Sequence, residues 1–379
     1  MTKKNILFVA DKPDWAYEFM IKSWLPYLLD DYDCYIIYQQ NYAIFKSNKQ
    51  SSFRRWIYNN ISKIKHFIKK TDLKLIHKDG YFYIKHRTPP LYKYIDYEGN
   101  KEKVTEKIFH FNQMIEMAFY FQYISFFPFT ADKKIVGIFT DSFPHDGPSY
   151  DIKRQLDRNK MNRKQFYDTY LAPYDYIFVG GGNLYNEYKN LTDKVSFVYG
   201  IYGEKNFIEN QNVGRKKTLT IGWTGTPDRP MKGFREIIEP VIEEIKSTGR
   251  EVVLKTRFSG AYEGLYNFYE DVDLIVIASS ADCGPFLFAE ACLSSVPAIS
   301  TKIGLPSMGI KHNENGLFIE RSKESLKEAI IELYENREKL IKFSERIKQD
   351  YMKILRNEES VKNVLRILND SEKNDNKKD

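Results

Sequence analysis

The chain has 379 residues, 42% of them hydrophobic and 15% aromatic, which is enough for two domains and excludes a disordered protein. Its three cysteines show no paired spacing, which argues against a disulfide framework or a zinc site and favours a reducing compartment. The net charge is +7, and residues 51–110 hold 14 lysines and arginines against 6 aspartates and glutamates. This one segment therefore indicates a local anionic partner.

The first half of the chain predicts a parallel sheet. The apolar run "NILFVA" (5–10) is expected to be a strand, "WAYEFMIKSWLPYLL" a helix and "CYIIY" the next strand. Further short apolar runs follow at 134–139, 174–180 and 194–200. The polar residues 203–216 are expected to be a linker. No signal peptide is visible, and the longest apolar stretch (117–129) is too short to span a membrane.

Residues 50–105 interrupt this alternation and resemble an insertion in the first domain. A helical face with Phe53, Ile57, Ile61, Ile64 and Ile68 has lysines and arginines on its other sides, and a tyrosine-rich stretch follows. The segment could pack on the domain with solvated charges, lie on an anionic membrane surface, or bind nucleic acid through phosphate contacts and tyrosine stacking. The first interpretation needs the fewest assumptions.

The second half repeats the strand–helix alternation. Strands are expected at "TLTIGWTG", "EVVLKT", "VDLIVIAS" and "VPAIST", with helices between them and a long helical stretch from Ser325 to Leu355. We expect an N-terminal Rossmann-like domain (1–205, insert at about 50–105), a C-terminal Rossmann-like domain (206–345), crossing helices (346–370) and a disordered tail (371–379). Ligands of such sheets bind beyond the carboxyl ends of the strands, so the cleft between two facing domains is the expected site.

The segment "SSADCGPFLFAEACLSSVPAIS" (279–300) carries the chemistry. A strand ends near Ser280, Gly284 permits a tight turn, and Pro285 suits the first turn of a helix. The helix N-terminus that includes Phe286 and Leu287 offers N–H groups and a positive dipole end to a phosphate. Asp282 and Glu290 could then accept hydrogen bonds from sugar hydroxyls. Spacing alone favours a plainer interpretation, in which these are a solvated turn carboxylate and an exposed helical glutamate.

The stretch "DCGPFLFAEACLSSVPAISTKIGLPSMGI…ENGLFI" resembles the donor-site signature of family 4 glycosyltransferases, which have the GT-B fold. The likeness rests on two carboxylates eight residues apart, the strand "PAIST", Gly304 and the pair Asn315-Gly316. It extends to "TIGWTGTPDRPMKGF", which is similar to a glycine turn of that family, and covers about 174–370. The resemblance implies an α/β protein of two Rossmann-like domains facing across a cleft, with a C-terminal helix that returns to the first domain.

The resemblance also implies roles for single residues. Glu290 would bind the ribose of a nucleotide, Asp282 the hydroxyls of the donor sugar, and Lys232 the diphosphate. The turn with Gly225 would approach the donor, and its next position, usually basic, is Thr226 here. Arg229 would then be the second phosphate ligand. Two cations would stabilise the charge that develops on the departing diphosphate.

The first domain is expected to contribute less certain groups. The family usually has a His-Asp pair after the strand at 134–139, where this chain has Thr140-Asp141 and, slightly later, His145. His145 could serve near the reacting sugar or be an ordinary loop histidine. Lys12 stands in a loop that usually carries glycines, and "GGGN" (180–183) suits either a close backbone approach or a plain turn.

The resemblance implies a retaining glycosyltransferase that moves a sugar from a nucleotide-diphospho-sugar, a UDP-sugar rather than a GDP-sugar, to an acceptor hydroxyl of a saccharide or glycoconjugate. No cofactor is expected, and no metal, because "DVD" (271–273) runs directly into a buried strand and no ligand cluster is visible. We expect the cytoplasm, or its inner membrane surface. The alternatives are an enzyme that glycosylates hydroxylated DNA bases, as phage enzymes do, and a non-catalytic sugar- or nucleic-acid-binding relative.

Overall fold

The computed structural model describes residues 2–38, 42–46, 73–78, 81–86, 90–104, 108–117, 129–139 and 161–369. The chain divides into two compact units, one of residues 1–18 and 25–135, the other of residues 19–24 and 136–379. The helical face expected at 53–68, most of the apolar run at 117–129, His145 and the tail from residue 370 lie outside the described residues.

The largest sheet has a parallel centre, as the first strands of the sequence predict. Its strand order is β11-β10-β9-β8-β1-β2-β6-β7. The pairs β1–β2, β1–β8 and β10–β11 are parallel, whereas β6 and β7 are added antiparallel at one edge. The bounds are β1 (Lys4–Ala10), β2 (Tyr32–Tyr38), β6 (Leu91–Tyr94), β7 (Lys101–Val104), β8 (Phe109–Glu116), β9 (Phe129–Ile138), β10 (Tyr176–Val179) and β11 (Val195–Phe197).

The insertion is partly β structure. Strands β3 (Tyr42–Lys46), β4 (Leu73–Lys78) and β5 (Tyr81–His86) form a separate antiparallel sheet in the order β3-β5-β4. The edge strands β6 and β7 of the large sheet follow it in the chain. The helical spacing in the sequence gave no indication of these strands. The helices of this half are α1 (Ala16–Leu28), α3 (Arg163–Phe166) with the π-turn η5 (Tyr167–Leu171), and α4 (Gly182–Lys189).

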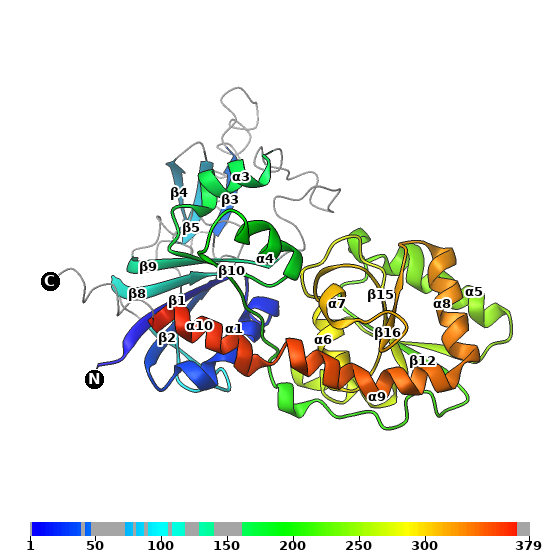
Figure 1. Cartoon of the computed structure of the whole chain (residues 1–379). Helices are drawn as coiled ribbons and strands as arrows, with labels where there is room; N and C mark the ends of the chain where they lie inside the picture. Colours follow the sequence, from blue (N-terminus) through cyan, green and yellow to red (C-terminus); the bar gives the residue numbers. More distant parts are fainter. Residues whose placement is uncertain are drawn as a thin grey trace. The chain divides into compact units, whose positions relative to one another are not determined.

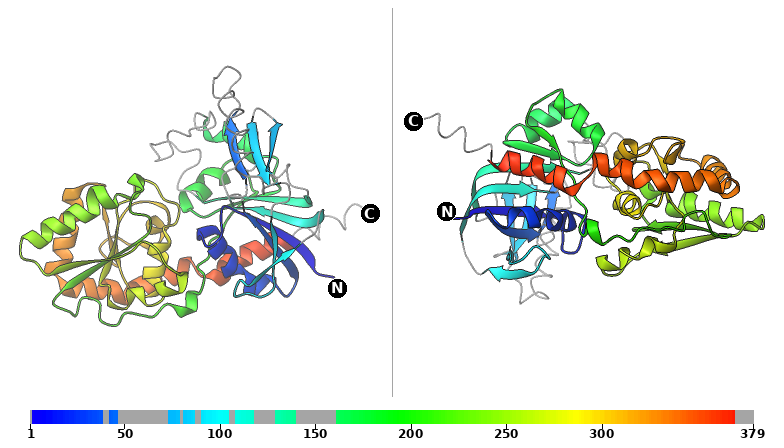
Figure 2. Two further views of the ribbon diagram at one scale, coloured as in Figure 1. Left: turned by 180° about the vertical axis from the view of Figure 1, so that it is seen from behind. Right: turned by 60° about the horizontal axis from the view of Figure 1, so that its bottom comes forward.

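The second half contains a five-stranded, all-parallel sheet in the order β13-β12-β14-β15-β16. Figures 1 and 2 show α5 and α8 on one face of this sheet and α6 with α7 on the other. Its inner strands are short and largely buried because helices cover both faces, whereas the edge strand β13 is mostly exposed or half-buried. They are β12 (Leu219–Thr224), β13 (Val252–Arg257), β14 (Leu274–Ile277), β15 (Ala298–Thr301) and β16 (Gly316–Ile319).

The helices of this half confirm the alternation, with one correction. The long helical stretch expected from Ser325 to Leu355 is two helices, because Asn336 ends one and its side chain caps the next by accepting from Lys339 N at 3.0 Å. The helices are α5 (Glu239–Ser247), preceded by the π-turn η8 (Phe234–Ile238), α6 (Phe286–Leu293), α7 (Gly304–Gly309), α8 (Lys323–Glu335), α9 (Arg337–Ile354) and α10 (Asn357–Asn369).

The last helix contacts β11, which belongs to the largest sheet, as the resemblance predicts. The side chain of Asn357 accepts from Ile201 N at 2.8 Å and donates to Ile201 O at 2.7 Å, and Ser360 accepts from Tyr199 N. Asn363 donates to Phe197 O at 3.1 Å, at the end of β11. Side chains of α10 therefore satisfy the backbone of the segment after β11.

The expected linker at 203–216 is irregular, with one 3-10 turn η6 (Glu204–Asn206), but it is packed rather than loose. Phe207, Asn210 and Val213 are buried in it. Gly214 N donates to Asp273 Oδ1 and Thr220 N to Asp273 Oδ2, each at 2.8 Å. Asp273 thus joins the segment before β12 to the amino end of the sheet with two backbone hydrogen bonds.

Candidate active site

Several loops meet at the carboxyl edge of the five-stranded sheet, because parallel strands end on the same side. The loop after β12 contains the 3-10 turn η7 (Pro230–Lys232), and the loop after β14 contains residues 278–285. They are joined by Ser280 N, which donates to Met231 O at 2.8 Å. Arg321 donates to Ala278 O and Pro230 O, each at 3.0 Å. The two loops therefore form one connected platform.

Gly233 allows the loop that carries Lys232 to pack closely against the end of β14. Its φ is +69°, in the left-handed region that favours glycine. A Cβ atom at this position would lie 2.5 Å from Ala278 O, at the end of β14. Only glycine allows this approach, so the turn that presents Lys232 is pressed directly against the neighbouring strand end.

Lys232 and Asp282 face one another across this platform. The Lys232 ammonium and the Asp282 carboxylate form an ion pair, with side chains only 21% and 15% exposed. The family resemblance implies that they contact adjacent parts of one donor, the diphosphate and the sugar. The structure brings them together, 50 residues apart in the chain, and joins them directly.

Glu290 lies in α6, whose residues from Leu287 to Leu293 are all buried. Its side chain is 2% exposed, which makes the interpretation as an exposed helical glutamate wrong. Tyr269 Oη donates to Glu290 Oε2 at 2.7 Å. Burial raises the pKa of Glu290 to about 7, while the hydroxyls of Tyr269 and Tyr262 and the charge of Arg257 oppose the shift. A buried carboxylate that titrates near neutrality is typical of functional sites.

The turn before α6 differs slightly from the expectation. The helix begins at Phe286, and Pro285 is its N-cap residue with φ −59° and ψ 113°, so the proline precedes the first turn. Gly284 fits because a Cβ there would lie 2.8 Å from the Tyr199 ring and 3.0 Å from Leu305. Gly284, Pro285, Phe286 and Leu287 thus lead into the helix that carries Glu290.

The remaining candidates of the β12 loop have the following geometry. Gly225 has φ +138°, and Thr226 is exposed with its carbonyl accepting from Arg229 N at 3.4 Å. The Arg229 side chain is half-buried and reaches Met231 Sδ at 3.3 Å. In the first unit, Lys12 Nζ lies 3.5 Å from the centroid of the Trp15 ring. His145, Thr140 and Asp141 lie outside the described residues.

Sequence reasoning missed Arg257, Tyr269 and Arg321. Arg257 ends β13 directly beside Thr224 of β12, and its Nη2 donates to Ala261 O at 2.6 Å. A Cβ atom at Gly260 or Gly264 would lie 2.7 or 2.6 Å from that nitrogen. The glycines of "RFSGAYEG" are therefore the sequence sign of a loop that wraps this guanidinium. Tyr269 gave no such sign, because an aromatic residue before a strand is usually core.

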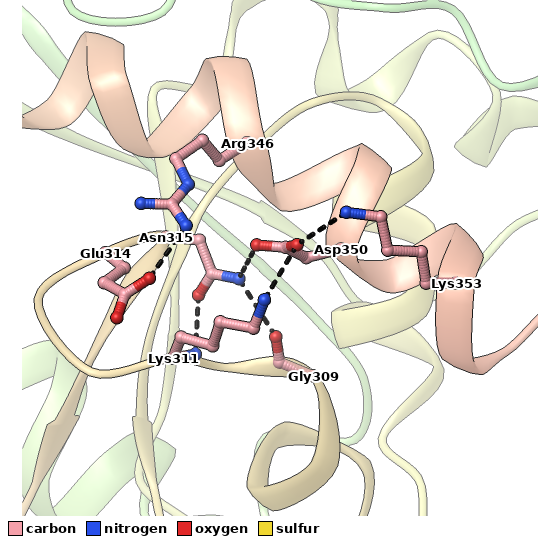
Figure 3. A network of polar contacts seen from close by, with 7 residues as sticks. All are labelled: Gly309, Lys311, Glu314, Asn315, Arg346, Asp350 and Lys353. Carbon is pink, nitrogen blue, oxygen red and sulfur yellow. Dashed lines mark hydrogen bonds and ion pairs between the residues drawn. The ribbon is translucent and has the colours of Figure 1, made fainter.

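The pair Asn315-Gly316, noted for its resemblance to a donor-site loop, has a structural role here (Figure 3). Asn315 is fully buried and donates to Asp350 Oδ2 and Gly309 O, each at 3.1 Å, while accepting from Lys311 N at 2.7 Å. Lys311 also bonds Asp350, at 3.0 Å. A Cβ at Gly316 would lie 2.7 Å from Ala298 O. This network fastens the loop after α7 to α9.

No group of three histidines, cysteines or carboxylates within the described residues is arranged to hold a metal ion. None of the helices described is long and apolar enough to cross a membrane.

Residues 242–350 match the family model "Glycosyl transferases group 1", a stretch that includes Arg257, Asp282 and Glu290. A search of curated proteins found no match.

Solved structures extend the likeness to nearly the whole chain. S. aureus TarM is 13% identical over 97% of this chain and 100% of its own, with a TM-score of 0.57. Anabaena Alr3699/HepE is 9% identical over 96% and 99%, with a TM-score of 0.59. Sucrose-phosphate synthase of Thermosynechococcus elongatus is 10% identical over 97% and 98%, with a TM-score of 0.61. Residues 242–350 are therefore similar to a glycosyltransferase domain, and the chain as a whole shares the GT-B fold of these structures.

Proposed function

We propose that the protein transfers a sugar from a nucleotide-diphospho-sugar, a UDP-sugar rather than a GDP-sugar, to a hydroxyl of a saccharide or glycoconjugate, with retention of anomeric configuration. The observation that carries the proposal is the arrangement at one sheet edge of a lysine, an aspartate and a buried glutamate. The donor domain would be residues 206–345. TarM has been solved with UDP and α-GlcNAc-glycerol, and HepE with UDP and glucose and with UDP-glucose, which supports this donor and acceptor class.

The proposed roles follow from charge. Glu290 would accept hydrogen bonds from the ribose hydroxyls, which are donors, once its carboxyl is ionised. Lys232, Arg229 and the N-terminus of α6 at Gly284–Leu287 would stabilise the diphosphate as it departs, with the turn at Gly225 and Thr226 alongside. Asp282 would accept from hydroxyls of the sugar. In front-face transfer the leaving phosphate takes the acceptor proton, so the mechanism needs neither a protein base nor a metal, and His145 would assist near the sugar.

The acceptor is proposed to be anionic or to lie at an anionic surface, a membrane or nucleic acid, because residues 51–110 concentrate the positive charge of the chain. Neutralising Lys63, Lys65, Lys69 and Lys70 together should leave donor hydrolysis unchanged. Transfer to a charged glycoconjugate should weaken, more at low salt than at high. Equal transfer at both salt concentrations would contradict this part of the proposal.

The test of the function is a thermal-shift and calorimetry screen with UDP, GDP, ADP, CMP, UDP-glucose and UDP-N-acetylglucosamine. A ligand that binds the folded state raises the unfolding temperature according to its affinity. We expect stabilisation by UDP and its sugars, lost in Glu290→Ala and kept in Glu243→Ala, an exposed carboxylate of α5. Release of UDP in the presence of saccharides, with NMR of the product anomer, then tests transfer and retention. No stabilisation by any nucleotide would contradict the proposal.

A further inference from the structure

Lys232 and Asp282 are held by backbone contacts that keep their two loops together. The Ser280–Met231 bond, the two bonds of Arg321 and the close approach of Gly233 to Ala278 O all lie within a few residues of the pair. When a ligand replaces one member of this ion pair, the two side chains therefore move and the loops stay together. Asp282 remains close to any group that binds Lys232.

The pair is also poorly screened. The two side chains are 21% and 15% exposed, so they interact through less water than a surface ion pair does. Removing one partner from such a pair leaves the other charge partly buried and uncompensated, which is costly. A ligand that replaces Asp282 as the partner of Lys232 therefore has to offer Asp282 a new partner as well.

An intact nucleotide-sugar offers a partner to both Lys232 and Asp282, whereas a nucleoside diphosphate offers one to Lys232 alone. The diphosphate supplies anionic oxygens for an ammonium, and a sugar supplies hydroxyl donors for a carboxylate, which can only accept when ionised. UDP alone would place a diphosphate next to the Asp282 carboxylate, and like charges so juxtaposed are strongly unfavourable.

We propose that the Lys232–Asp282 ion pair makes the site discriminate against the nucleoside diphosphate product: an intact sugar donor replaces both partners of the pair, whereas UDP breaks it and leaves Asp282 unpaired. This inference rests on the proposed function and gives Asp282 a second task besides contacting the sugar. After transfer, the pair re-forms as UDP leaves, so the contact present without ligand favours product release.

An alternative arrangement makes the opposite prediction. If Lys232 contacts the phosphate and Asp282 at once, the carboxylate only holds the ammonium in position. Asp282→Asn would then weaken the binding of UDP and of UDP-glucose together. The sign of the change in UDP affinity therefore separates the two arrangements.

The experiment is calorimetric titration of UDP and UDP-glucose into the full chain, its Asp282→Asn variant and a matched control. The control is Asp228→Asn, which removes the same charge from an 80% exposed side chain of the Lys232 loop. We expect Asp282→Asn to bind UDP roughly tenfold tighter than the unchanged protein, since one like charge beside the diphosphate is gone. UDP-glucose should bind it no tighter, so the preference for the donor over UDP falls about tenfold. Asp228→Asn should change neither affinity by more than about twofold.

The outcomes are distinguishable. Unchanged or weaker UDP binding by Asp282→Asn overturns the inference and leaves the function standing. Binding of neither UDP nor GDP by the unchanged protein overturns the proposed function itself, and with it the inference. If GDP binds instead of UDP, the same titrations use GDP and GDP-mannose. Should Asp282→Asn fail to fold, Asp282→Ser removes the same charge with a smaller side chain, and the same tightening of UDP binding is required of it.

Discussion

Two buried carboxylates at opposite ends of one parallel sheet have different surroundings. Asp273, at the amino end of β14, accepts from two backbone N–H groups, Gly214 and Thr220. Glu290, near the carboxyl edge, accepts from the Tyr269 hydroxyl and has the charge of Arg257 nearby. Burial raises the pKa of both, and backbone donors oppose the shift only at Asp273. Burial alone therefore does not distinguish the two carboxylates; the kind of partner does.

The largest expected effect comes from removing the carboxylate of Asp273, at the amino end of the sheet. Asp273→Ala leaves two buried N–H groups without an acceptor, so the free energy of unfolding should fall by about 3 kcal/mol. Urea denaturation measures this. UDP affinity of the folded fraction should stay unchanged, because the lost bonds lie at the other end of the sheet. A variant of normal stability, or one with altered UDP affinity, would remove the distinction between the two carboxylates.

The reciprocal change is Glu290→Gln. It keeps the size of the side chain and an acceptor for Tyr269 but loses the charge. UDP affinity should fall roughly 30-fold, equivalent to about 2 kcal/mol for hydrogen bonds to a charged group. The free energy of unfolding should hold or rise slightly, since a desolvated carboxyl is gone. Calorimetry and urea denaturation of the same sample test both parts; a variant that loses stability but binds UDP normally would make Glu290 a structural residue.

The pH dependence follows from the raised pKa of Glu290, about 7 in the folded chain against a usual value of 4.5. Between these values the folded state binds the proton more tightly than the unfolded state. This group therefore stabilises the fold less as pH rises from about 4.5 to 7. UDP affinity should change in the opposite direction and fall about fivefold between pH 7 and 6 as the carboxylate protonates. Titrations across this range, with Glu290→Gln as the reference lacking the group, should show the opposed trends.

A third carboxylate, Asp350, sharpens the comparison. Burial alone would raise its pKa, but Lys311 and Asn315 hold the pKa below its usual range. Asp350→Asn should lower the free energy of unfolding by about 1 kcal/mol, because Lys311 loses its partner and one bond of Asn315 weakens. UDP affinity should not change. A loss of affinity would show that the loop fastened to α9 in Figure 3 also supports the donor site.

The smallest expected effect concerns Arg257, which we expect to act through Glu290. Its charge favours the ionised carboxylate, so Arg257→Gln should move the midpoint of the UDP-affinity profile to higher pH and weaken binding a few-fold at pH 7. Arg235→Gln, on the exposed side of η8, is the control. Five tyrosines also interact electrostatically with Glu290 and contribute to this pH profile: Tyr199, Tyr262, Tyr266, Tyr269 and Tyr351. A uniform loss at every pH would instead indicate a direct contact.

The sequence alone was sufficient to predict the strands of the second half and the residues that follow them. Short apolar runs followed by glycine or polar residues identify parallel strands, and this places Asp282 and Lys232 on loops of the same edge. Their ion pair could not be predicted, because it depends on the approach of Gly233 to β14, a tertiary contact. The burial of Glu290 was also missed, since a helix covered on all sides has no polar face to reveal which residues are inside.

The first half was less predictable for a physical reason. Strands β3, β4, β5, β6 and β7 are antiparallel additions whose apolar and charged residues lack a clean period. Strands β4 with β5 and β6 with β7 pair as neighbours in the chain, whereas β3 with β5 and β2 with β6 pair across longer stretches that local spacing does not reveal. The β1–α1–β2 unit, in contrast, is local and was recognised from its spacing.

The docking of α10 has a consequence for synthesis. The amides of Tyr199 and Ile201 donate to the side chains of Ser360 and Asn357, about 160 residues later in the chain. A nascent polypeptide that has not yet exposed residues 357–363 outside the ribosome cannot complete these bonds. The segment after β11 therefore reaches its final hydrogen bonding late in translation, however early the strands before it have formed.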